Sequence, residues 1–174
     1  MKVRFVSVAG DEALAPRLRE DLLDTWVAVT EAGGAVGFVP PAPVPRIAAT
    51  LDAVLARIAD GTDALGVLYD GDRAVGMGIL AADGGVLRRH WRWVLRVMVH
   101  PDHQGNGAGA LLMNGLHEVA TGLGLEQLIL TIRDGLGLER FYARFGYEII
   151  GRHPTAIRLA PGDDRDEVYL LAKL

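Results

Sequence analysis

The sequence predicts a single α/β domain, an α+β arrangement in which helices and strands share one core. The chain has 174 residues, the size of one domain, and half of them are hydrophobic, enough for a sizeable core. The hydrophobic pattern changes several times between the four-residue spacing of helices and the alternation or short apolar runs of strands. In order, the segments predict β-α-α-β-β-β-α-β-α-β-β, without a repeat or a domain linker.

The beginning of the chain predicts a strand followed by a helix. Residues 3–9 alternate and are rich in branched side chains, so they favour a strand. Residues 10–34 predict a helix that is capped by Asp11 and ends at two glycines. Four side chains at four-residue spacing form its apolar face: Leu14, Leu18, Leu22 and Trp26.

A proline-rich loop separates this helix from a second one. Residues 35–45 contain four prolines, which exclude a continuous helix there. Residues 46–61 predict the second helix, with Gly61 as its natural end. Its apolar side consists of Ile47, Leu51, Leu55 and Ile58.

The rest of the chain predicts six strands and two helices. The apolar runs of residues 63–82 are joined by Asp70, Gly71 and Asp72, a typical hairpin turn. The remaining expected strands are residues 88–100, 126–132, 147–151 and 166–174, and the expected helices are 105–124 and 135–146.

Composition narrows the function classes. The formal net charge of −4 does not favour broad nucleic-acid binding. The absence of cysteine excludes disulfides, thiolate catalysis and cysteine-based metal sites. No apolar run reaches transmembrane length and the first residues lack a signal-peptide core, so we expect a cytoplasmic protein without a membrane partner.

A glycine-rich segment, QGNGAG, follows an apolar strand and begins a helix. A helix N-terminus exposes free N–H groups, and a loop without side chains lets an anion approach them closely. The phosphate loop of nucleoside triphosphatases is excluded, because Ala110 and Leu111 follow Gly109 where Lys and Ser or Thr are needed.

Two other patterns fit these glycines. Gly105, Gly107 and Ala110 match the dinucleotide pattern G-x-G-x-x-A, but residues 100–104 separate strand from glycines and Glu126 precedes the next strand rather than ending it. The pattern Q/R-x-x-G-x-G/A is satisfied by Gln104, Gly107 and Gly109.

The stretch VMVHPDHQGNGAGALLM resembles motif A of the GNAT superfamily of N-acetyltransferases, which bind acetyl-coenzyme A, and LERFYARFGYE resembles a later motif of that superfamily. The order of elements resembles the GNAT fold along the whole chain. The resemblance implies a mixed, mostly antiparallel sheet whose fourth and fifth strands splay apart. EAGGAVGF with the prolines after it, and VYLLAKL, are similar to the tabtoxin-resistance branch, which implies a small amine or amino-acid-like acceptor.

The resemblance also implies a cofactor site between residues 92–100 and 127–132. The backbone of Val97 and Val99 would pair with the pantetheine arm, and the N–H of Met98 or Val99 would stabilise the oxyanion of the tetrahedral intermediate. Gln104 stands where the family often has Arg, and its uncharged amide would order the loop. The backbone N–H groups expected to hold the pyrophosphate are those of Gly105, Asn106, Gly107, Ala108, Gly109 and Ala110.

Tyr142 lies four residues before Gly146, at the position of the family's acid tyrosine. It would contact the cofactor and protonate the leaving thiolate. The alternative is a tyrosine that only packs in the core.

A general base is harder to assign. Many family members carry a Glu on the fourth strand, but RRHWRWVLRV contains no acid. The candidates are Glu31, Asp83, His90 or a water, and we take Glu31 as the catalytic candidate.

The acceptor site is expected beside the proline-rich loop. Its predicted walls are Trp26, Val36, Gly37, Phe38 and Trp93, although Phe38 could instead fill the core. Strict alternation places Trp91, Trp93 and Leu95 on one face of their strand and Arg92, Val94 and Arg96 on the other. That second face is a solvated surface, a contact for an acidic acceptor, or a subunit interface.

Two charged segments are interpreted as turns. His100, Asp102 and His103 suggest a turn around Pro101 rather than a metal site. The segment PGDDRDE suggests a solvated turn before the last strand.

The predicted function is transfer of an acetyl group from acetyl-coenzyme A to a primary amine of a small molecule, by direct attack in a ternary complex. The alternatives are a non-catalytic module that binds acetyl-coenzyme A, and an acetyltransferase acting on protein N-termini or lysines. The resemblance further implies a homodimer.

Overall fold

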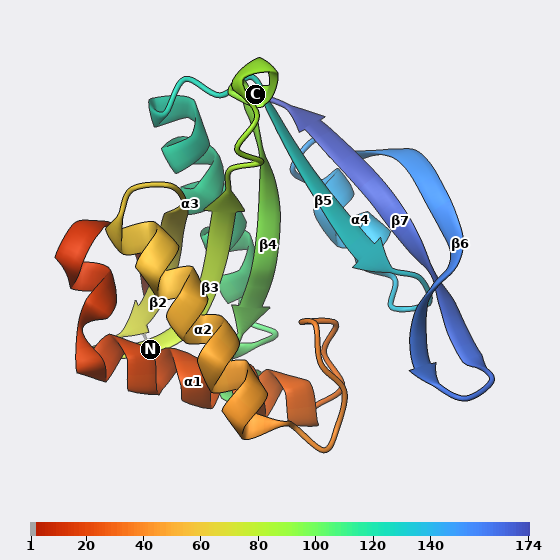
Figure 1. Cartoon of the computed structure of the whole chain (residues 1–174), viewed down its shortest axis with the longest axis horizontal. Coiled ribbons are helices and arrows are strands. Elements are labelled where there is room, and N and C mark those ends of the chain that lie inside the picture. Colours follow the sequence, from red (N-terminus) through yellow and green to blue (C-terminus); the bar gives the residue numbers. More distant parts are fainter. Residues whose placement is uncertain (1–2) are drawn as a thin grey trace.

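The computed structural model describes residues 3–174 and contains one seven-stranded sheet in the order β1-β2-β3-β4-β5-β7-β6 (Figure 1). All neighbouring strands are antiparallel except β4 and β5, which are parallel. The predicted order of helices and strands is confirmed. The strands are β1 (Val3–Val8), β2 (Ala64–Asp70), β3 (Arg73–Ala81), β4 (Trp91–Val99), β5 (Gln127–Arg133), β6 (Glu148–Ala160) and β7 (Asp163–Lys173).

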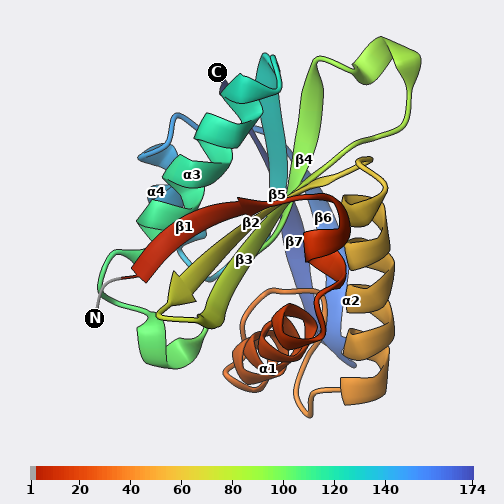
Figure 2. The same ribbon diagram turned by 90° about the vertical axis from the view of Figure 1, so that its left-hand side faces the viewer.

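Helices cover both faces of the sheet. Helices α1 (Pro16–Glu31) and α2 (Val44–Ala59) lie on one face, and α3 (Ala108–Gly122) and α4 (Leu138–Ala143) lie on the other (Figure 2). A separate hydrophobic cluster fills each interface: Trp26 belongs to the first, and Leu112 and Tyr142 belong to the second. Within the part of the chain that the structure describes, no helix is both long and apolar enough to cross a membrane.

The fourth and fifth strands diverge, as predicted. Trp91, Arg92 and Trp93 pair with residues 127–129, and the pairing stops there. Beyond Trp93 the two strands separate, and the loop that joins α1 to α2 lies at the open end of this split (Figure 1). The split therefore leaves backbone groups of β4 and β5 without a neighbouring strand.

The start of the first helix differs from the prediction. Residues Gly10–Leu14 form a short 3-10 turn, and α1 begins only at Pro16. Proline is favoured in the first turn of a helix, but its ring clashes with a helical turn that directly precedes it. Pro16 therefore keeps the 3-10 turn and α1 separate. Asp11 consequently does not cap α1, and Leu14 is exposed rather than part of its apolar face. Helix α2 begins two residues before the predicted start, at Val44, with proline in its first turn.

The last two strands are longer than predicted. β6 runs thirteen residues, from Glu148 to Ala160, and β7 begins at Asp163, inside the segment interpreted as a solvated turn. Both extensions are largely polar, because most of this hairpin is exposed to solvent and needs no apolar alternation. Backbone pairing with each other, not burial, holds these residues in strands.

Strict alternation along β4 also fails. The register with β3 shifts between Met77 and Ile79, and Arg96 opposite this shift has a φ of +53°. Such a bulge turns the side chains beyond it to the other face. Arg96 consequently points toward Trp26 and α1, on the same side as Trp93, and not to the opposite face.

Candidate active site

A cavity of about 720 Å³ opens in the split between β4 and β5. We call it the glycine-loop cavity, because Gly105, Gly107 and Gly109 form one end of it. All of the predicted cofactor residues line it except Asn106 and Ala108. The predicted residues that line it are Val97, Met98, Val99, Gln104, Gly105, Gly107, Gly109, Ala110 and Tyr142.

The glycine loop presents backbone N–H groups without side chains in front of them. Gly105 and Gly107 have φ values of +79° and +89°, and a Cβ on either would meet open space. Within the described chain, the N–H groups of Gly105, Gly107, Gly109 and Ala110 have no hydrogen-bond acceptor outside the helix. Together with the dipole of α3 they form a site for an anion.

The two exceptions have structural roles. The Asn106 side-chain oxygen accepts a hydrogen bond from the N–H of Ala108 at 3.3 Å, which holds the first turn of α3. Ala108 itself is buried in the core. Gln104 donates from Nε2 to the carbonyl of Val99 at 2.8 Å, so its amide orders the loop as predicted.

The register of β4 determines which backbone groups face the split. The N–H of His100 donates to the Val75 carbonyl at 2.8 Å, and Met98 pairs with Met77 in the same register. Alternate residues of an antiparallel strand bond to the same neighbour, so the N–H of Met98 also faces β3. The backbone of Val97 and Val99 faces the split. Of the two N–H groups predicted as oxyanion donors, that of Met98 is therefore directed to β3, whereas that of Val99 is directed to the split.

Tyr142 places a neutral hydroxyl at the glycine-loop cavity. Its side chain is 8% exposed and packs between the rings of Phe141, at 5.0 Å, and Tyr147, at 5.7 Å. Burial raises the pKa of Tyr142 to about 12, because the phenolate would lose its hydration. At neutral pH this hydroxyl is a proton donor.

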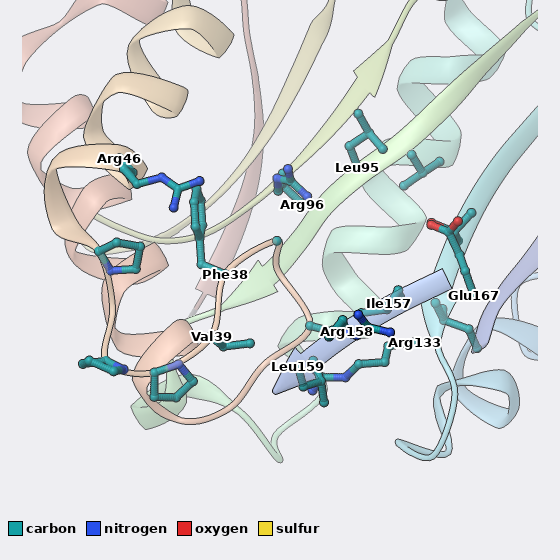
Figure 3. Close-up of a pocket in the computed structure, with 18 residues that line it drawn as sticks. Phe38, Val39, Arg46, Leu95, Arg96, Arg133, Ile157, Arg158, Leu159 and Glu167 are labelled. Carbon is teal, nitrogen blue, oxygen red and sulfur yellow. The ribbon is translucent and has the colours of Figure 1, made fainter. Parts of the chain in front are cut away.

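A second cavity, of about 610 Å³, lies beside the first (Figure 3). We call it the proline-loop cavity, because the loop from Ala35 to Pro43 forms one wall and β4, β5 and the β6–β7 hairpin form the others. The residues shared by both cavities are Ala35, Val94, Arg96, Thr131 and Ile132. The cavities meet where the strands of the split diverge.

The predicted acceptor residues are divided between several places. Gly37 and Phe38 line the proline-loop cavity, whereas Val36 lines the glycine-loop cavity. Trp26 is fully buried and donates from Nε1 to the Val36 carbonyl at 3.1 Å, which positions the loop. Trp93 lines neither cavity, because it packs edge-on against neighbouring rings at the closed end of the split.

None of the predicted general bases lines either cavity. Glu31 accepts a hydrogen bond from the Ala42 N–H at 2.8 Å and so closes the base of the proline-rich loop. Asp83 is paired with Arg88, and His90 lies in an exposed turn. The structure thus gives Glu31 and Asp83 local partners away from the cavities.

Sequence reasoning missed Glu167. It is the one acidic residue of the described chain that lines either cavity, and its carboxylate accepts a hydrogen bond from the Tyr169 hydroxyl at 2.9 Å. Glu167 lies on β7 opposite Arg133 of β5. Alternation along the predicted last strand, residues 166–174, places Glu167 on the face shared with Tyr169 and Leu171 and could have identified it.

The histidine-containing segment forms a turn, as predicted. Residues Pro101–His103 form a 3-10 turn, in which His100 Nδ1 accepts a hydrogen bond from the N–H of Asp102 at 3.3 Å. His103 instead contacts Asp70, at 3.2 Å. Over residues 3–174, no group of three or more His, Asp or Glu side chains is arranged to hold a metal ion.

A split sheet with a bare N–H loop at one end and a neutral tyrosine beside it is the arrangement expected of an acyltransferase that uses a coenzyme A thioester. The model of the acetyltransferase (GNAT) family matches residues 19–147. The chain therefore belongs to the GNAT family of acetyltransferases. No curated protein matches the sequence.

Several solved structures have the same fold. One is yncA, a putative acetyltransferase from Salmonella typhimurium with its cofactor acetyl-coenzyme A: 16% identity, TM-score 0.73, and 100% and 95% of the two chains covered. Another is a ribosomal-protein-alanine N-acetyltransferase from Brucella melitensis (19%, 0.74, 100% of both chains). A third is a putative phosphinothricin N-acetyltransferase (14%, 0.79, 98% of both chains). At these identities the likeness shows the fold alone.

The residues present fit acetyl-coenzyme A. The backbone of Val97 and the N–H of Val99 offer hydrogen bonds to an extended amide-containing arm, and the N–H groups of the glycine loop suit its phosphates. Gln104 contributes no charge, but Arg144, directly after α4, brings a guanidinium to the wall of the same cavity.

Proposed function

We propose that this acetyltransferase acetylates the primary amine of a small molecule by direct attack in a ternary complex. The observation that carries the proposal is the junction of the two cavities at Arg96 and Thr131. A cofactor in one cavity and an acceptor in the other would be in direct contact there. A volume of about 610 Å³ is within the usual range for small-molecule sites.

Three groups of the chain would carry the reaction. Acetyl-coenzyme A, when bound, supplies the acetyl group as an activated thioester. The N–H of Val99 faces the split and would stabilise negative charge on the thioester oxygen. Glu167, in the proline-loop cavity, would accept the proton of the acceptor ammonium, directly or through a water, and Tyr142 would donate a proton to the departing sulfur. In this proposal Glu167 takes the role first considered for Glu31.

The assembly is proposed as a homodimer. β6 is an edge strand of the sheet, and Ile149 and Ile150 on it are each more than half exposed. An exposed apolar edge of this kind is protected when a second copy covers it.

The proposal is tested by measuring thiol release from acetyl-coenzyme A with a panel of primary amines. We expect amine-dependent release, at least about tenfold above the amine-free rate, and an N-acetylated product by mass spectrometry. Tight acetyl-coenzyme A binding without turnover of any amine would instead support a non-catalytic module. Turnover only with peptides would support a protein acetyltransferase.

Replacing Glu167 with Gln should lower kcat/KM about 100-fold at pH 7, because the amide cannot accept the ammonium proton. The deficit should shrink at higher pH, where more of the acceptor amine is already deprotonated. Steady-state rates between pH 6.5 and 9.5 measure both effects. Glu126→Gln is the matched control, since Glu126 is exposed and lines neither cavity. A Glu167→Gln enzyme with the wild-type rate and pH profile would exclude Glu167 as the base.

A further inference from the structure

Arg96 is a half-buried arginine held in a strained backbone conformation. Its φ of +53° is unusual for a residue other than glycine and coincides with the bulge between β3 and β4. Strained residues of this kind persist only where the surrounding structure holds them, and they concentrate at functional sites. Arg96 lines both cavities and so lies at their junction. Figure 3 shows its side chain among the residues of the proline-loop cavity.

The guanidinium of Arg96 contacts two neighbours. Its central carbon lies 5.3 Å from the centre of the Trp26 ring, within the range of a cation–π contact. Gly37, with a φ of +97°, also lies against it, and a Cβ on Gly37 would come within 2.9 Å of the guanidinium. The loop can approach so closely only because residue 37 has no side chain. Arg96 is thus oriented before any ligand arrives.

Two of the other arginines of the proline-loop cavity have polar partners. Arg158 makes a bidentate ion pair with Asp164, at 2.7 and 2.8 Å, and Arg133 donates to the Gly33 carbonyl at 3.0 Å. Arg46 lies over the ring of Phe38 but is exposed, so water solvates its charge. Arg96 differs from all three, because it is partly buried and has neither a carboxylate nor a hydrogen-bond acceptor among residues 3–174.

An unpaired cation in this position lowers the stability of the protein unless a ligand supplies the opposite charge. Burial lowers the pKa of Arg96, which reflects the loss of hydration of its charge. A half-buried charge without a counter-ion destabilises the protein. An anionic ligand would remove this cost, and the planar guanidinium fork matches a carboxylate with two parallel hydrogen bonds.

We propose that Arg96 binds a carboxylate of the acceptor, so that the substrate is an amine that also carries a carboxylate, as in an amino acid. This inference rests on the proposed N-acetyltransferase function and defines its substrate class. Arg96 and Glu167 come from the two sides of the split, β4 and β7, and both line the proline-loop cavity. The carboxylate of such a substrate would bind Arg96, and its amine would face Glu167.

The test uses acceptors in matched pairs: L-methionine with L-methioninamide, and L-phenylalanine with L-phenylalaninamide. We expect Arg96→Met to lower kcat/KM for the carboxylate member about 100-fold, mainly through KM, and to change that of the carboxamide less than about threefold. Comparing the two enzymes for each acceptor cancels the different reactivity of the two amines. Arg89→Met is the matched control, because Arg89 is exposed and lines neither cavity.

A second variant and a binding measurement keep the test independent of folding and of turnover. Asn tolerates a positive φ better than Met, so Arg96→Asn should fold even if Arg96→Met folds poorly. It should then show the same selective loss for the carboxylate acceptors. If wild type acetylates no amine, the proposed function fails, and the same probes are then titrated while tryptophan fluorescence is followed. Trp26 beneath the guanidinium should report binding of the amino acids but not of their amides, and only in wild type. Equal losses for both members of a pair, loss of acetyl-coenzyme A binding, or an unchanged preference in Arg96 variants would overturn the proposal.

Discussion

Replacing Gly107 with Glu should lower the affinity for acetyl-coenzyme A at least about 100-fold, because like charges brought together cost several kcal/mol. Gly107 is the residue directly before α3 and has a φ of +89°. A side chain there would stand in front of the free N–H groups, and its carboxylate would meet the phosphates. Isothermal titration calorimetry with acetyl-coenzyme A measures the loss.

The control for this variant is Gly124→Glu. Gly124 lies just beyond the other end of α3, also has a positive φ, of +71°, and a Cβ there would likewise meet open space. Both variants therefore carry similar backbone strain and the same added charge, so thermal unfolding should shift similarly in both. If Gly107→Glu binds acetyl-coenzyme A as tightly as Gly124→Glu does, the glycine loop is not the phosphate site.

Replacing Tyr142 with Phe should lower kcat about 100- to 1,000-fold, the usual contribution of a general acid, and leave acetyl-coenzyme A affinity nearly unchanged. The substitution removes the one hydroxyl while keeping the ring contacts with Phe141 and Tyr147. Rapid-mixing measurement of thiol release, beside calorimetric binding, separates the two effects. Tyr147→Phe is the matched control, because its buried hydroxyl has no partner in the described chain and lies outside both cavities.

The pH dependence of this difference follows from the raised pKa of Tyr142. Burial favours the neutral phenol, so its proton is retained up to about pH 12 instead of being lost near the ordinary value of 10.0. The ratio of wild-type to Tyr142→Phe rates should therefore stay constant from pH 7 to pH 10, in contrast to the pH-dependent deficit expected for Glu167→Gln. A ratio that collapses near pH 8 would contradict Tyr142 as the acid, as would a full rate in Tyr142→Phe.

The split between β4 and β5 connects the fold to these expectations. A continuous sheet would use every backbone group of Val97 and Val99 in pairing with β5, whereas the pairing stops at Trp93. The open strands leave the backbone of Val97 and the N–H of Val99 free, while the Val99 carbonyl accepts from Gln104. They also create the space in which both cavities meet. The α1–α2 loop closes the open end, where Trp26, Glu31 and Arg133 hold it by hydrogen bonds.

Most of the cofactor side of the site could be predicted from the sequence. The spacing of Gln104, Gly107 and Gly109, and of Tyr142 from Gly146, is local, and local spacing survives into the structure because each motif lies within one loop and one helix. The acceptor side could not be predicted in this way. Its walls come from the α1–α2 loop, β4, β5 and the β6–β7 hairpin, which are far apart in the chain.

Three features of the acceptor side differ from what the sequence suggests, and each difference has a separate physical cause. The direction of Arg96 depends on a bulge, and a shift of one residue reverses every later side chain of a strand. Glu167 lies where the predicted last strand and the segment interpreted as a solvated turn overlap, and the polar residues before it hide the alternation that identifies a strand. Glu31 carries a carboxylate at a suitable place in the sequence, but the N–H of Ala42 binds it.

The sequence by itself determined the order of elements, the glycine loop with its bare N–H groups, and the tyrosine at the end of the short helix, since each depends on residues close together in the chain. Only the tertiary structure decided which backbone groups of β4 are free, which carboxylate lines the proline-loop cavity, and that an unpaired guanidinium stands at the junction. These features depend on strand register and on contacts between distant segments, which the residue pattern of any single segment does not contain.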